Sequence, residues 1–176
     1  PAINFGGTDN QLLQSTSSLG MNGSNTFAEF YVLKGNWTSG LQWDEFITLG
    51  GGNHRWENTA VGAGARYHVY GNGTTGGASS TTGPLFNDLG LYSHTRNAVG
   101  AAVFRSNGEI RTTNATPGNL SLSGNFRIGT DVDATDGDGN FAGFWAPELI
   151  VYNTTLTDTE IRRVNSYLGI KYSIPM

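Results

Sequence analysis

A cluster of oxygen-bearing side chains between residues 131 and 140 is the stretch of this chain best suited to hold a metal ion. Four carboxylates and one carboxamide are spaced there among small residues: Asp131, Asp133, Asp136, Asp138 and Asn140. Hard oxygen donors in a glycine-containing loop can fold inward around Ca²⁺ at about 2.3 to 2.6 Å. The spacing departs from an EF-hand loop, because no Glu stands at its final position. The stretch predicts either a calcium site, with calcium as a cofactor, or a solvated acidic turn.

Aromatic side chains form a second candidate site. Trp37 and Trp56 occur in the turn-rich stretches GNWTSG and GNHRWEN, where a large exposed ring would need a function. Flat aromatic faces stack on the C–H surfaces of sugars, while neighbouring polar side chains hold the hydroxyl groups. We therefore predict that Trp37, Trp56 and Tyr70 bind a glycan, with burial of these rings as the alternative. Trp43 and Trp145 stand beside predicted strands and are expected in the core.

The carboxylates and histidines do not form a recognisable catalytic set. Retaining glycosidases place two carboxylates about 5 to 5.5 Å apart across one cleft. Asp44 and Glu45 are adjacent and would point to opposite faces of a strand, and Glu29 stands alone in its segment. The three His residues are scattered, with no Ser-His-Asp or His-x-x-x-His pattern. The sequence predicts a protein without enzymatic activity, and a glycosidase is the remote alternative.

The elements that must position these residues are clearest near the C-terminal end. Residues 148–152 (ELIVY) predict a core strand covered on both faces. Residues 157–160 (TDTE) form a capping box, so a helix is expected to begin near Asp158. Gly169 and Pro175 predict a weak last turn and an extended tail.

The helix should carry an apolar stripe that lies on a sheet. Leu156 and Ile161 are placed for a hydrophobic staple, and Val164, Leu168 and Tyr172 continue the stripe at helical spacing.

Earlier segments predict many short strands. Residues 26–33 (TFAEFYVL) alternate around Phe30 and Val32 and predict a central strand. Further strands are expected at 43–49, 66–70, 89–94, 98–105, 109–111 and 125–128. Asn107-Gly108 predicts a tight hairpin turn, because both residues tolerate positive φ. Many strands followed by one helix favour an all-β sandwich.

Composition narrows the class further. The 176 residues suit one domain, and 26 Gly with only 14% charged residues favour strands and turns over helices. The absence of Cys excludes disulfides and thiolate metal sites. A net charge of −4 gives no basic field for nucleic acid, and no apolar run of about 18 residues could span a membrane. The chain begins at Pro1 rather than Met, which is typical of a processed protein or of a domain cut from a longer one.

Two ends of the chain resemble a known family. Residues 148–153 (ELIVYN), 156–160 (LTDTE), Tyr167-Leu168 and Lys171-Tyr172 resemble the C-terminal signature of laminin-G-like domains of the concanavalin A-like lectin/glucanase superfamily. Residues 3–12 (INFGGTDNQL) are similar to the first strand of such domains. The resemblance implies one domain over residues 1–176, built as a two-sheet antiparallel jelly-roll sandwich with one C-terminal helix packed on it.

The resemblance also implies a class of function. It indicates a non-enzymatic carbohydrate-binding or adhesive module of a secreted or surface protein, with a glycan or cell-surface polysaccharide as partner. Laminin-G-like domains often hold calcium at the rim of the sandwich, which accords with the acidic stretch. The alternative is a structural module, such as a spacer, a filament subunit or a virion decoration protein, that self-associates and binds no sugar. The expected location is extracellular or at a cell surface, or a virion surface under the alternative.

Overall fold

The computed structural model describes residues 2–6, 13–17, 26–35, 44–49, 54–60, 65–71, 78–80, 88–97, 101–114, 125–129 and 143–176. Within these residues the chain forms two antiparallel sheets of six strands each and one helix. The first sheet has the spatial order β1 (Ile3–Gly6), β12 (Gly143–Tyr152), β3 (Phe27–Gly35), β8 (Gly90–Arg96), β9 (Ala102–Ser106) and β10 (Glu109–Asn114). The second has the order β2 (Leu13–Gln14), β11 (Arg127–Ile128), β4 (Asp44–Leu49), β5 (His54–Ala60), β6 (Ala65–Gly71) and β7 (Ala78–Ser80).

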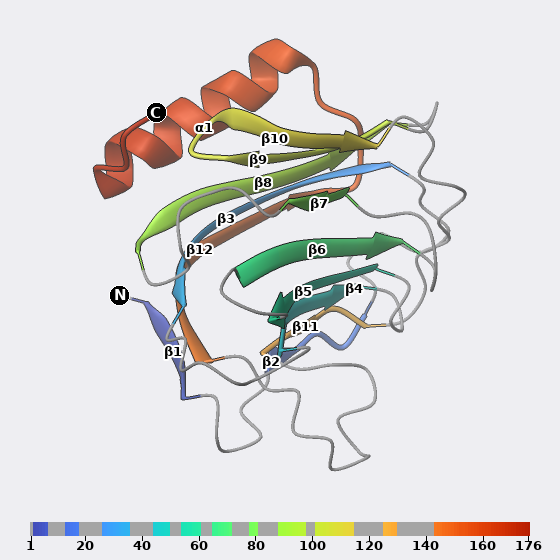
Figure 1. Cartoon of the computed structure of the whole chain (residues 1–176), viewed down its shortest axis with the longest axis vertical. Helices are drawn as coiled ribbons and strands as arrows, with labels where there is room; N and C mark the ends of the chain where they lie inside the picture. The colour runs from blue at the N-terminus through green and yellow to red at the C-terminus, as the bar shows by residue number, and fades with distance from the viewer. Residues whose placement is uncertain are drawn as a thin grey trace.

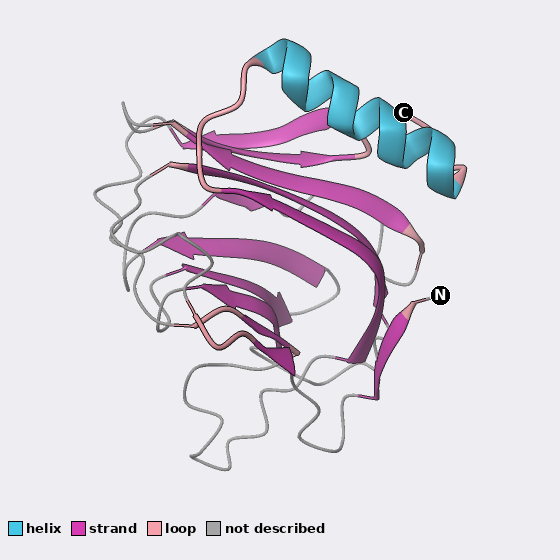
Figure 2. Cartoon of the chain, turned by 180° about the vertical axis from the view of Figure 1, so that it is seen from behind, coloured by secondary structure: helices cyan, strands magenta, loops and turns pink. Residues whose placement is uncertain are grey.

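The helix and the two sheets lie in layers. Helix α1 (Asp158–Tyr172) covers one face of the first sheet, and the second sheet lies on the opposite side, as Figures 1 and 2 both show. The central part of the first sheet is therefore covered on both faces, which explains why its central strands are buried, polar side chains of β8 included. The prediction of antiparallel strands with one C-terminal helix is confirmed.

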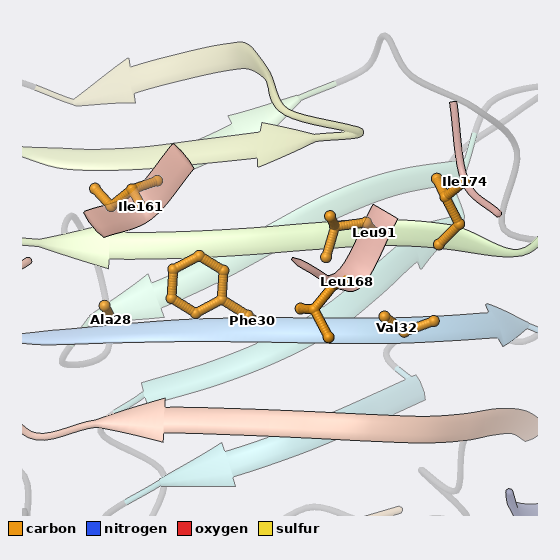
Figure 3. Close-up of a cluster of buried hydrophobic side chains, with 7 residues drawn as sticks. All are labelled: Ala28, Phe30, Val32, Leu91, Ile161, Leu168 and Ile174. Atoms are coloured by element: carbon orange, nitrogen blue, oxygen red, sulfur yellow. The ribbon is translucent and has the colours of Figure 1, made fainter. Parts of the chain in front are cut away.

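Strand β3 is the centre of the first sheet. It pairs with β12 on one side and β8 on the other, and every residue from Phe27 to Leu33 is buried. Ala28, Phe30 and Val32 lie on the face toward α1, where they form a cluster with residues of the helix (Figure 3). The predicted central strand is confirmed, because its alternation supplies apolar side chains to the helix-covered face.

The start of α1 follows the predicted capping box. The Glu160 amide donates to the Thr157 hydroxyl oxygen at 3.3 Å, and the Thr157 amide donates to a Glu160 carboxylate oxygen at 2.8 Å. Ile161 and Leu168 are buried in the cluster with Phe30 and its neighbours (Figure 3). Leu156, Val164 and Tyr172 pack against this cluster. The predicted apolar stripe is confirmed, and it fixes the helix on the sheet.

The tail after α1 folds back onto the helix, so the prediction of an extended tail is wrong, whereas the predicted weakness of the last turn stays a prediction. Ser173 adopts a left-handed conformation with φ 55°, and its amide donates to the Ile170 carbonyl oxygen at 3.3 Å. The Ile174 amide donates to the Gly169 carbonyl oxygen at 2.9 Å, which completes a Schellman motif, and Ile174 is buried against the helix. A Cβ on Gly169 would lie 2.8 Å from Met176 Cγ, so this glycine lets the tail fold back.

The hairpin between β9 and β10 has the predicted tight turn. Asn107 and Gly108 have φ values of 49° and 78°, as a two-residue primed turn requires. The Asn107 side-chain oxygen also accepts from the Leu91 amide at 3.0 Å, and the Asn107 amide donates to the Leu91 carbonyl oxygen at 2.7 Å. The turn is thereby tied to β8 as well as to its own hairpin.

The other predicted strands occur at the expected positions in the sequence, but some begin or end at different residues. The strand expected at 98–105 begins at Ala102 within the described residues, and the one expected at 109–111 continues to Asn114. Strand β5 was not predicted, so the placement of Trp56 in a turn-rich stretch is wrong. The run HRWENTA has no apolar alternation, and it is held as a strand by pairing with β4 and β6.

Candidate functional site

The predicted sugar and calcium residues lie largely outside the part of the chain that the structure describes. Trp37 and the acidic stretch Asp131, Asp133, Asp136, Asp138 and Asn140 fall outside it, so these remain predictions. Trp56 and Tyr70 are described in backbone position alone, on the neighbouring strands β5 and β6. Trp56 pairs with Val69, and Tyr70 pairs with Arg55, so the two aromatic residues lie one register position apart. Successive positions alternate between the two faces of a sheet, so the backbone places Trp56 and Tyr70 on opposite faces of the second sheet.

The buried polar residues of the first sheet do not form an active site. Glu29 pairs across strands with His94, and Tyr31 donates a hydrogen bond to the Glu29 carboxylate. Neither of these neighbours is the second carboxylate that a glycosidase pair requires. Burial first, and then the charge of Glu29, raise the pKa of Tyr31. Glu29 is 0% exposed and His94 is buried, so a substrate cannot reach either group in this structure.

Trp145 was expected in the core, but it is 52% exposed. It pairs with Lys34 of β3, beyond an irregularity in the register between Trp145 and Glu148. Val32 is buried in the cluster with the helix, whereas Lys34 on the same face is exposed. The cover given by α1 therefore ends between these two positions, and Trp145 lies on the uncovered part of the sheet.

A pocket lies where β12 meets the last turns of α1. It has a volume of about 540 Å³ and is lined by Pro147, Glu148, Leu149, Lys171 and Tyr172. Strand β12 supplies the first three residues, and helix α1 supplies the other two. Glu148 and Lys171 meet across 23 positions of sequence. We define these five residues, with Tyr167 one helical turn before Lys171, as the β12–α1 pocket.

Hydrogen bonds hold the polar groups of the β12–α1 pocket together. The Lys171 ammonium donates to Glu148 Oε2 at 2.7 Å and to the Tyr167 hydroxyl oxygen at 3.0 Å. The Tyr172 hydroxyl donates to the same Glu148 oxygen at 2.7 Å. The Lys171 nitrogen also lies 5.3 Å from the ring centre of Tyr167 and 5.4 Å from that of Tyr172, within the range of a cation–π contact.

These contacts fix the ionisation of the pocket near neutral pH. Burial raises the pKa of Glu148, but the hydrogen bonds from Lys171 and Tyr172 outweigh it, so the pKa lies below its ordinary value. The hydrogen bond to Glu148 raises the pKa of Lys171 well above its ordinary range. Burial and then the bond to Glu148 raise the pKa of Tyr172. The pocket therefore holds one carboxylate, one ammonium group and the neutral phenol of Tyr172.

The β12–α1 pocket presents one carboxylate and one ammonium group. Glu148 is the one carboxylate that lines the pocket among the described residues, so the pair that a glycosidase needs is not assembled from them. The described residues also contain no group of three or more His, Asp or Glu side chains that could hold a metal ion. In that same part of the chain, no helix is long and apolar enough to cross a membrane.

Sequence reasoning missed this pocket, although two of its signals are local. Tyr167 and Lys171 are four residues apart, a spacing that places two side chains side by side on a helix. Glu148 directly precedes the apolar run LIVY within β12, which marks a polar position at the edge of covered surface. Glu148 and Lys171 come together through the packing of α1 on the sheet, and this contact cannot be predicted from either segment alone.

No family model matches the sequence, and no curated protein matches it. Solved structures resemble it in fold. A botulinum neurotoxin serotype D/C binding domain has a TM-score of 0.67 at 13% identity, covering 95% of this chain and 43% of that one. The binding domain of botulinum neurotoxin DC in complex with rat synaptotagmin II has a TM-score of 0.60 at 13% identity, covering 96% and 46%.

A third structure concerns botulinum neurotoxin type C, whose cell entry depends on interaction with two ganglioside molecules. Its TM-score is 0.62 at 12% identity, covering 96% of this chain and 46% of that one. The chain thus spans less than half the length of these structures. At such low identity the likeness shows a shared fold, with antiparallel sheets and a C-terminal helix.

Proposed function

We propose that this chain is a non-enzymatic carbohydrate-binding or adhesive module of an extracellular or cell-surface protein. The observation that carries the proposal is the fold likeness over 95% or more of the chain to neurotoxin binding domains. One of these was solved in complex with SialylT, and another belongs to a toxin that interacts with gangliosides. In this proposal the two sheets form a concanavalin A-like jelly-roll sandwich of the laminin-G-like type.

The surface chemistry of the described residues supports a binding role. Trp145 and Tyr167 are half exposed, and such rings supply flat apolar faces for sugar C–H groups. The predicted residues Trp37, Trp56 and Tyr70 would supply further glycan contacts, with Trp56 and Tyr70 on opposite faces of the second sheet, and the stretch 131–140 would hold calcium at the rim. These two sites stay predictions within the proposal.

A glycan array tests the proposal directly. The whole chain should bind a defined set of glycans saturably, and soluble glycan should compete with the binding. Incubation of the same preparation with β-glucan should release no reducing sugar, because a carboxylate pair is not predicted. The absence of binding to all glycans with and without millimolar Ca²⁺ would contradict the proposal.

One observation favours the structural alternative, a self-associating module. Ile110, Ile170 and Met176 are exposed. The Met176 side chain lies against both Gly108, two residues before Ile110, and Gly169, which directly precedes Ile170. Exposed apolar side chains in one region mark interaction surfaces. If this alternative is correct, sedimentation velocity should show association that depends on protein concentration, and the double substitution Ile110→Ser with Ile170→Ser should abolish it. A monomer at all concentrations would contradict the alternative.

A further inference from the structure

We infer that the β12–α1 pocket is a binding subsite for a neutral saccharide that presents vicinal hydroxyl groups. The inference rests on the proposed carbohydrate-binding function and adds a location and a ligand class to it. The pocket lies on the helix-covered face of the first sheet, whereas the predicted residues Trp56 and Tyr70 belong to strands of the second.

The pocket is built on rigid elements. Lys171 and Tyr172 belong to the last turn of α1, which is anchored by the fully buried Leu168 and closed by the Schellman motif. Glu148 belongs to β12, which pairs with Val32 of the central strand at this position. Side chains held in place before a ligand arrives lose little conformational freedom on binding, which favours affinity.

The polar groups match the hydrogen-bonding pattern of a diol. Lys171 has three N–H donors, of which two are used by acceptors among the described residues. The Tyr167 hydroxyl accepts from Lys171, so its own hydrogen can be donated to a ligand oxygen. The Glu148 carboxylate has further lone pairs that can accept from a hydroxyl hydrogen. One cation and one anion 2.7 Å apart can thus bind two adjacent hydroxyl groups, each of which donates and accepts.

The apolar groups match the C–H surface of a sugar ring. Tyr167 is 51% exposed, and its hydroxyl group accepts from Lys171, so the residue borders the polar pair. Pro147 adds apolar surface on the strand side, whereas the register places the Leu149 side chain on the opposite face of β12. A saccharide that stacks on Tyr167 would bring its hydroxyl edge toward Lys171 and Glu148, which is the usual division of a sugar site into a flat face and a polar edge.

The local charge selects a neutral ligand over an anionic one. The charge of Lys171 is balanced by Glu148, and further along the helix Arg163 interacts electrostatically with Glu160. An acidic sugar would bring a carboxylate close to Glu148, and like charges in close contact are unfavourable. A neutral saccharide meets no such repulsion, so neutral glycans should bind more tightly than their sialylated forms.

The test begins with wild-type protein on an array of matched neutral and sialylated glycans. The best neutral glycan is then titrated by calorimetry into Tyr167→Ala, Tyr167→Phe and Ile170→Ala proteins. Loss of the ring should weaken binding about tenfold, and loss of the hydroxyl alone should weaken it about threefold. Ile170→Ala is the matched control, because Ile170 is 82% exposed on the same helix and does not line the pocket. Its affinity should stay within twofold of the wild type.

Amide chemical-shift mapping of the wild type with the same glycan provides a readout independent of any variant. The largest changes should fall at residues 148, 167, 171 and 172. Glycan binding with unchanged affinity in Tyr167→Ala and no shifts at these residues would overturn the inference while the proposed function stands. Binding restricted to sialylated glycans would overturn the neutral class, and no glycan binding at all would overturn both the subsite and the proposed function.

Discussion

The anchoring of α1 on the first sheet can be tested by Leu168→Ala. Leu168 is 0% exposed and lies in the buried cluster with Phe30, Val32, Leu91 and Ile174. The substitution removes the apolar group that joins the last turns of the helix to two strands and to the folded-back tail (Figure 3). It leaves intact the hydrogen bonds that form the helix.

The expected loss follows from this setting. Buried Leu→Ala substitutions cost about 2 to 5 kcal/mol, depending on how far the neighbours relax into the space. The strands beneath Leu168 are paired on both sides and can move little, so we expect about 3 to 4 kcal/mol. For a chain of this length, 1 kcal/mol corresponds to about 2 to 4 °C in Tm, so the shift should be about 6 to 16 °C.

Thermal and urea unfolding followed by circular dichroism would measure the loss. Ile170→Ala serves as the control, because its side chain is 82% exposed and its truncation should change the free energy of unfolding by no more than about 0.5 kcal/mol. A Leu168→Ala protein as stable as this control would refute the packing of α1 described above. A large loss of stability in both proteins would instead show that the helix face carrying Ile170 is buried against another surface in solution.

Three further predictions concern single interactions. Thr157→Ala should lower the free energy of unfolding by about 1 kcal/mol in urea titration, because it removes the N-cap acceptor; an unchanged midpoint would argue against the cap. Glu148→Gln should reduce stability at neutral pH. Because the folded pKa of Glu148 is lowered, its contribution is present above the unfolded pKa of about 4.3 and is lost as the pH falls through the folded value, so wild type and variant should converge in acid. Calcium should stabilise the folded protein by about 2.7 kcal/mol at a hundredfold excess over Kd, and this should raise Tm. The double substitution Asp133→Asn with Asp136→Asn should abolish the response, and an equal response in the variant would place calcium elsewhere.

Features set by neighbouring residues could be predicted from the sequence. The capping box needs only Thr157 and Glu160, and the hairpin turn needs only Asn107 and Gly108, so the local chemistry determines both. The central strand was predictable as well, because its alternation shows which side chains are buried.

Features set by distant contacts could not be predicted. Strand β5 forms through pairing with its neighbours, and the exposure of Trp145 follows from where the helix stops covering the sheet. The β12–α1 pocket needs Glu148 and Lys171 to meet across 23 positions of sequence. The local sequence pattern does not show which distant residues come into contact, so the pocket could be identified only from the structure.

The pairing of β3 also has a consequence for the order of events in folding. Both partners of this strand are remote in sequence, since β8 begins at Gly90 and β12 ends at Tyr152, and the helix that covers it follows later still. Non-local pairing slows folding, because the entropy of closing long loops is lost before the contacts form. During synthesis, β3 therefore leaves the ribosome with apolar side chains and open strand edges long before its partners exist. Folding should be slow and prone to aggregation at this strand, and chaperones that bind extended apolar segments should act here first.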